Sequence, residues 1–241
     1  MFGSAYLIPA FALSVLAFTP TEAGQLLVPG GAFFIGALLI AAYLMQARRV
    51  PPFATVPFGI GLIMLAMWML SGSTSESGAP DMMVAILLRG LGLGFLFLSI
   101  TLIAFSKLNR QNLACGIGLF NTGRQLGGLI GVAALQTMIH HNAIANAAIL
   151  GADITAGEGA VIERLTTTTA MLADKGIDAA GAGRAATSLL GQVVMGQSTV
   201  LAFDTAFVAV ALLFALAAPI LIGIKIGLAR YAKVRAMRTV G

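Results

Sequence analysis

The chain has 241 residues, of which 59% are hydrophobic and only 10% are charged. This composition is too apolar for a soluble domain of that length, so the lipid bilayer is the expected solvent. The net charge is +5, but the basic residues form no patch interleaved with aromatic residues, so nucleic acid is not an expected partner. The single cysteine, Cys115, excludes an intrachain disulfide and suggests no metal site.

Six apolar stretches are close to the length of about 20 residues that a helix needs to cross roughly 30 Å of hydrocarbon. They cover residues 3–18, 23–45, 53–70, 82–105, 113–139 and 199–224. Helices are required, because a strand in lipid would leave backbone groups unpaired. The sequence therefore predicts an all-α polytopic membrane protein with six transmembrane helices.

The first stretch could be mistaken for a signal peptide, because it is short and N-terminal. No charged segment precedes it, Pro9 interrupts its middle, and no small-x-small cleavage pattern follows Phe18. We therefore interpret it as a membrane span. An initiator Met placed directly on an apolar helix suggests that the reading frame once began further upstream.

The connections between the stretches alternate in charge. Basic residues without acidic neighbours follow the second, fourth and sixth stretches: Arg48, Arg49, Lys107, Arg110, Lys225, Arg230, Lys233, Arg235 and Arg238. The other connections hold Glu22, Glu76, Asp81, Asp153, Glu158, Glu163, Asp174 and Asp178 against only Arg164, Lys175 and Arg184. Because Lys and Arg accumulate in short cytoplasmic loops, we expect both termini in the cytoplasm, with residues 225–241 as a basic tail.

Residues 142–198 form an outward connection that is too long for a plain loop in a compact protein. Apolar residues recur there at roughly helical spacing, and Gly181 and Gly183 separate two such stretches. We expect two amphipathic helices at the outward-facing membrane interface. A partly disordered loop is the alternative.

Two arginines lie inside apolar stretches, where a guanidinium is costly without a partner or a function. At 1.5 Å per residue, Arg89 lies about 10 Å from the outer end of the fourth stretch and Arg124 about 16 Å from the inner end of the fifth. Each could fix packing by pairing with backbone carbonyls or a neighbouring helix. Alternatively, Arg124 faces a water-filled cavity with Asn121 and Gln125, and contacts substrate or responds to a proton-carrying carboxylate.

The fifth stretch also carries small and polar residues on one side, since positions 121, 124, 125 and 128 share a helical face. Gly123, Gly127 and Gly131 repeat at a spacing of four, which permits close helix contact in lipid. Asp204, near the outer start of the sixth stretch, is an interfacial cap, an outer gate contact or a protonation site.

Catalytic patterns are missing from the sequence. It has no Ser-His-Asp set, Walker loop or buried carboxylate pair, so we expect neither an enzyme nor a cofactor. His140 and His141 are adjacent and cannot share a helical face, which argues against a metal pair.

Five segments carry a family resemblance: residues 2–9, 23–30, 88–94, 118–133 and 201–207. The most specific is the fifth-stretch pattern GLFN followed by RQLGGLIGVA. Together the segments resemble the C-terminal half of the EmrB/QacA-type drug:proton antiporters, fourteen-span members of the major facilitator superfamily. The resemblance implies one half of a major facilitator fold in a bacterial inner membrane, exporting amphipathic or cationic organic compounds in exchange for protons.

The chain departs from the family pattern in two places. Residues 46–52 read QARRVPP and lack the Asp of the gating motif that such proteins often keep there, so gating is expected to differ. Nothing in the chain resembles the N-terminal half, which holds the antiporter motif in this family. Since the substrate of a facilitator fold lies between two halves, one half offers only one wall of the site.

Two functions therefore stay open. In the first, the chain is the C-terminal half of a proton-coupled efflux transporter and works with the missing N-terminal half or by self-association. Asn121, Arg124 and Gln125 would then line the cavity, with Arg89 and Asp204 as gating or proton-linked residues. In the second, the chain is a truncated remnant or an assembly partner of another membrane protein and transports nothing itself.

Overall fold

The computed structural model describes residues 2–106, 108–109, 111–153, 159–176 and 178–238, without side-chain detail for 153, 160, 179, 218 and 220–238. Lys107, Arg110 and Glu158, three residues of the charge pattern, lie outside the described residues. The side chains of the predicted basic tail also lie outside them.

Every element in the described residues is a helix, which confirms the predicted all-α fold class. The helices are α1 (Phe2–Ser14), α2 (Pro20–Ala47), α3 (Pro52–Ser71), α4 (Ala79–Phe105), α5 (Leu113–Asp153), α6 (Gly159–Asp174) and α7 (Ala179–Arg238). Within the described ranges, four segments are long and apolar enough to cross a membrane: Pro20–Ala47, Pro52–Ser71, Ala79–Phe105 and Ala180–Ala217. Six spans therefore stay a prediction.

The first helix is shorter than the sequence suggested. It ends at Ser14 rather than at Phe18, since the chain turns at Ala17, which adopts a left-handed φ of 52°. Its 13 residues extend about 20 Å, less than the roughly 30 Å of a hydrocarbon core. The next helix begins at once, because Thr19 and Glu22 form a capping box with N···O distances of 2.8 and 3.3 Å.

α4 lies between α2 and α3, and its glycines let it approach both neighbours. Gly90 faces α2, where an added Cβ would contact the carbonyl oxygen of Gly30. Gly92 faces α3 instead, where an added Cβ would lie 2.8 Å from the carbonyl oxygen of Gly59. Residues two apart on a helix point about 200° apart, so this short glycine run serves two opposite contacts.

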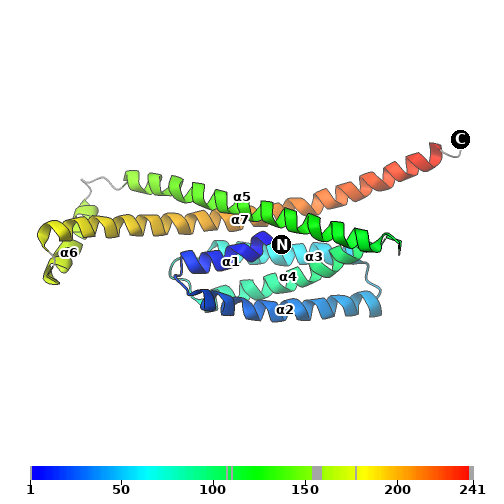
Figure 1. The fold of residues 1–241 in the computed structure, drawn as a ribbon, viewed down its shortest axis with the longest axis horizontal. Helices are drawn as coiled ribbons and strands as arrows, with labels where there is room; N and C mark the ends of the chain where they lie inside the picture. The colour runs from blue at the N-terminus through cyan, green and yellow to red at the C-terminus, as the bar shows by residue number, and fades with distance from the viewer. Residues whose placement is uncertain (1, 107, 110, 154–158, 177, 239–241) are drawn as a thin grey trace.

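α5 and α7 are longer than a membrane crossing requires. At 1.5 Å per residue, the 41 residues of α5 extend about 60 Å and the 60 residues of α7 about 90 Å. The two helices lie side by side along the group formed by α1 to α4 and continue past it toward α6 (Figure 1). Residues 142–198 are thus helical almost throughout their described part: the end of α5, then α6, then the start of α7.

α1 is held against α7 by aromatic contacts. The ring of Phe11 lies edge-on to Phe203 and Phe207, with centroids 5.5 and 5.9 Å apart. Edge-to-face pairs at such separations contribute about 0.5–1.5 kcal/mol each beyond their buried area. This contact positions α1 beside α5 and α7, where the candidate site lies.

The glycine contact between α2 and α4 can be tested with matched Gly→Ala variants. We expect Gly90→Ala to lower the free energy of unfolding by about 1–3 kcal/mol, because the new methyl group meets backbone that cannot rotate away. Gly61→Ala on α3 is the control, since a Cβ there meets nothing within 4 Å. It should raise helix stability by up to about 1 kcal/mol. The measurement is unfolding in detergent, followed by fluorescence of Trp68; equal midpoints would contradict the close approach.

Candidate functional site

Arg124 lies on α5 where this helix passes α4. Its Nη2 donates a hydrogen bond to Oδ1 of Asn121 at 3.2 Å. The guanidinium carbon lies 5.4 Å from the ring centroid of Phe97 on α4, within the range of a cation–π contact. The Nε atom is buried and has no hydrogen-bond partner among the described residues. One donor of the guanidinium is therefore unsatisfied, which is costly away from water.

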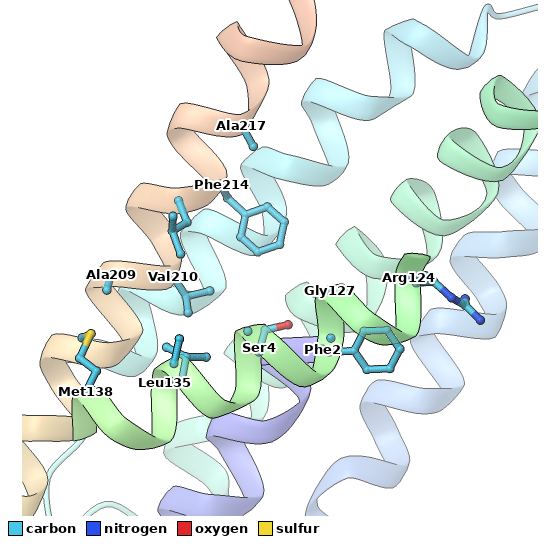
Figure 2. A pocket seen from close by; sticks show the side chains of 15 residues that line it. Phe2, Ser4, Arg124, Gly127, Leu135, Met138, Ala209, Val210, Phe214 and Ala217 are labelled. Carbon is cyan, nitrogen blue, oxygen red and sulfur yellow. The ribbon is translucent and has the colours of Figure 1, made fainter. Parts of the chain in front are cut away.

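Arg124 borders a cavity of about 540 Å³ between α1, α5 and α7, called here the Arg124 cavity. Its described lining is Phe2, Gly3, Ser4, Arg124, Gly127, Gly128, Gly131, Ala134, Leu135, Met138, Ala209, Val210, Leu213, Phe214 and Ala217. Figure 2 shows Arg124 at one end, with its guanidinium directed away from Val210 and Phe214. Three of the α5 residues that line the cavity are glycines, and their missing side chains leave space there: Gly127, Gly128 and Gly131.

Arg124 also lines a second cavity of about 370 Å³, on the side of α5 that faces α4. Phe97 and Thr101 contribute from α4, and Phe120 and Gly123 from α5. Arg124 therefore stands between two cavities that are mostly apolar. A guanidinium in this position can bind an anionic or hydrogen-bond-accepting group that enters from either side.

Asn121 and Gln125 line neither of these two cavities. Both side chains are exposed on the surface of the chain. Gly123 and Gly127 line the cavities and lie on one side of Arg124 around the helix. At about 100° per residue, Gln125 lies on the other side. Asn121 still reaches Arg124 through its amide oxygen. The assignment of Asn121 and Gln125 to the cavity of an intact transporter stays a prediction.

Arg89 lies inside the helix bundle, with 8% of its surface exposed. Its Nε donates to Oγ of Ser4 on α1 at 3.4 Å. Ser4 is fully buried and also lines the Arg124 cavity, so α1 connects the surroundings of the two arginines.

Asp204 lies apart from both arginines. It is partly buried on α7, and its carboxyl group lies close enough to the side chain of Ser71, the last residue of α3, to interact with it. The hydroxyl of Ser71 is also 2.8 Å from the carbonyl oxygen of Trp68. Asp204 lines neither cavity beside Arg124, so the residues selected from the sequence do not gather at one place.

Aromatic residues around Arg124 could not be selected from the sequence. Phe97 contacts the guanidinium, Phe2 packs against Gly128, and Phe214 lines the cavity. Phenylalanine is common in any apolar span, so no spacing or composition signal distinguishes these three from other core residues. Only the packing of α1, α4 and α7 around α5 identifies them.

No protein-family model matches the chain. Two curated relatives from two strains of Mycobacterium tuberculosis, each named multidrug resistance protein B homolog, match over 172 residues with 27% and 26% identity. Each match covers 68% of this chain but only 32% of the relative. The chain thus spans about a third of the length of these relatives. Together with its apolar helices, the similarity indicates a multi-pass membrane protein.

The hydrogen bond between Arg89 and Ser4 can be tested with a single and a double variant. We expect Ser4→Ala to lower the free energy of unfolding by about 1–3 kcal/mol, because it removes an acceptor from a buried charge. Adding Arg89→Met should recover part of this loss, since no charge then remains to be satisfied. Ser75→Ala, at an exposed turn, serves as the control and should change little. The free energy of unfolding of all four proteins, wild type included, is measured in detergent. An equal loss of this free energy in the single and the double variant would contradict the pairing.

Proposed function

We propose that the chain is the C-terminal half of a proton-coupled efflux transporter of the major facilitator type. Three observations support this proposal. The relatives carry the name of a multidrug resistance protein. The order of sequence segments resembles the EmrB/QacA type, and four helices are long and apolar enough to cross a membrane. The exported compounds would be amphipathic or cationic organic molecules.

The observation that carries the proposal is the surroundings of Arg124. Its guanidinium lies against Phe97 between two mostly apolar cavities, and its Nε has no partner within the described chain. A charge held in this way is expensive in hydrocarbon, so a function for it is the default hypothesis. We assign Arg124 to contact with the substrate or with a proton-carrying group. Asn121 orients the guanidinium of Arg124.

The open surface of α5 supports the idea of a missing half. Leu119, Leu129 and Ile130 are 69–74% exposed, and the polar residues Asn121 and Gln125 are exposed beside them. Added Cβ atoms at most of the nearby glycines would meet nothing within 4 Å. Polar and glycine-rich faces pack poorly against acyl chains, so a second set of helices is expected to cover this surface. The partner would be the missing N-terminal half or a second copy of the chain.

Arg89 and Asp204 take supporting roles in this proposal. Arg89 fixes the packing of α4 against α1 through Ser4. Asp204 lies near Ser71 at the end of α3, and we assign this interaction between α7 and α3 to a contact that opens when the helices move. In the bacterial inner membrane, both termini would face the cytoplasm, as the alternating loop charges suggest.

A remnant or assembly partner that transports nothing is the second candidate. The reason to consider this candidate is that a single half supplies only one wall of a facilitator site. Proton-dependent transport by the chain alone would decide against this candidate.

Dye efflux tests the proposal directly. The chain is expressed in a strain stripped of its own pumps, at matched levels, with a protonophore control. We expect Arg124→Ala to reduce proton-dependent efflux by about 10–100-fold, the value of a hydrogen bond to a charged group. Efflux by Arg124→Lys should lie between that of the wild type and that of Arg124→Ala, since Lys keeps the charge but lacks the planar guanidinium group of Arg. Arg164→Ala, exposed on α6, is the matched control and should leave efflux unchanged. No efflux despite stable insertion would favour the remnant.

Cysteine labelling tests the orientation. In a Cys115→Ser background, we expect Ser75→Cys, between α3 and α4, to react with a membrane-impermeant maleimide in intact cells. Arg49→Cys, between α2 and α3, should react only after the cells are permeabilised, because basic loops stay in the cytoplasm. The reverse pattern would show that the orientation is inverted, and labelling of both sites from outside would show that α3 does not span.

A further inference from the structure

Phe97 on α4 lies between an arginine of α5 and an aromatic ring of α2. On one side, the guanidinium carbon of Arg124 lies 5.4 Å from the centroid of its ring. On the other side, Phe34 of α2 lies edge-on to it, with ring centroids 6.0 Å apart and ring planes inclined by 71°. Phe97 takes part in both contacts, so it connects the packing of α2 to the guanidinium on α5.

The guanidinium of Arg124 has two directed contacts in the described part of the chain. Asn121 accepts a hydrogen bond from Nη2 at 3.2 Å, but it belongs to the same helix and moves with Arg124. Phe97 provides the other contact, and this contact ties the guanidinium to a different helix. The buried Nε atom adds no hydrogen bond to these two within the described residues. The orientation of the guanidinium relative to α4 therefore depends on the ring of Phe97.

The ring of Phe97 is in turn supported by the close approach of α2. Gly94 lies one turn before Phe97 on α4 and shares its face. An added Cβ at Gly94 would lie 2.7 Å from the carbonyl oxygen of Phe34, so the backbones of α2 and α4 are in contact at this point. Phe34 thus meets α4 through its backbone and through its ring. A separation of α2 from α4 would withdraw the ring that supports Phe97.

We propose that Phe97 is a positioning residue for Arg124 and that Phe34 supports it, so that the guanidinium is held in place while α2 packs against α4. When α2 separates from α4, Phe97 can turn and Arg124 keeps its contact with Asn121 alone. The side chain of Arg124 is then free to reorient between the two cavities that it borders. The use of this release in transport rests on the proposed function, whereas the positioning itself does not.

The test measures the motion of Arg124 by NMR of the full chain in detergent micelles, with 15N-labelled arginine. The chain has ten arginines, and Arg124→Lys identifies the Nε–H signal of Arg124 by the loss of that signal. We expect its order parameter to lie above about 0.6 in the wild type and below about 0.6 in Phe97→Leu, since lower values mark a flexible group. Phe97→Tyr keeps the face of the ring and should restore the wild-type value.

Phe95→Leu is the matched control. Phe95 is on the same helix, and its ring pairs edge-on with Phe58 of α3 at 5.2 Å rather than with Arg124. The variant loses the same atoms and weakens the packing of α4, but the order parameter of Arg124 should stay at the wild-type value. An equal fall in Phe95→Leu and Phe97→Leu would overturn the proposal, because the cause would then be a general loosening of α4.

The role of α2 is tested with two further pairs of variants. Phe34→Leu should lower the order parameter of Arg124, whereas Phe33→Leu, at an exposed neighbouring position, should not. Gly94→Ala should lower it too, because the new methyl group pushes α2 away from α4. Gly36→Ala is its control, since an added Cβ there meets nothing within 4 Å. An unchanged order parameter in Phe34→Leu or in Gly94→Ala would overturn the connection to α2.

The positioning role is overturned if the order parameter of Arg124 is unchanged in Phe97→Leu, or if it lies below about 0.6 in the wild type. If Phe97→Leu fails to fold, as judged by its unfolding midpoint, Phe97→Met takes its place, because the flexible Met side chain fills irregular space without the face of a ring. The spectra require no transport. Absence of efflux beside the expected spectra would overturn the proposed function and leave this inference standing. Unchanged spectra beside efflux that depends on Arg124 would do the reverse.

Discussion

The backbone contact of α4 with α2 and α3 is the constraint on which the rest of the structure depends. Helices in lipid gain little from burying apolar surface against one another, so close packing must hold them together. Gly90 and Gly92 provide this packing in opposite directions, against Gly30 and Gly59. The position of α4 then fixes the surroundings of both arginines. It turns Arg89 into the bundle, and it presents Phe97 to α5.

The two arginines carry the same charge but have different surroundings in this fold. α4 is covered on several sides, so Arg89 is buried and relies on Ser4 of a neighbouring helix. The first part of α5 touches few other elements, so Arg124 remains partly exposed and binds mainly its own helix and one ring. The first arrangement stabilises the packing of helices. The second leaves a charged group at the edge of space that another molecule can enter.

Much of the fold could be predicted from apolar length alone. The second, third and fourth stretches correspond to α2, α3 and α4, because a long uninterrupted run of apolar residues has few alternatives in a membrane. The end of α1 could not be predicted, since it depends on a left-handed turn at Ala17, a residue with no preference for that conformation. The continuation of α7 upstream of residue 199 also could not be predicted. The apolar stretch begins at that residue, but the helix itself has no break there.

The small-residue pattern illustrates the limit of prediction for the site. Glycines recur near Arg89 and near Arg124, and the sequence assigns close contact to both. In the described residues, only the first set meets other backbone, whereas Gly123 and Gly127 meet nothing within 4 Å. Spacing shows that a helix can be approached closely, but the partner that approaches is a property of tertiary structure. The contact of Phe97 with Arg124 is of the same kind, since residues 27 positions apart meet only through packing.

The length of α7 has a mechanical consequence. One continuous helix includes both the apolar segment beside α3 and the segment packed on α6, so a tilt of the first segment moves the second. The 20 residues from 179 to 198 extend about 30 Å, so a tilt of roughly 10° in the apolar segment would carry the far end sideways by about 5 Å. The position of α6 and of the start of α7 therefore depends on the tilt of the apolar segment of α7.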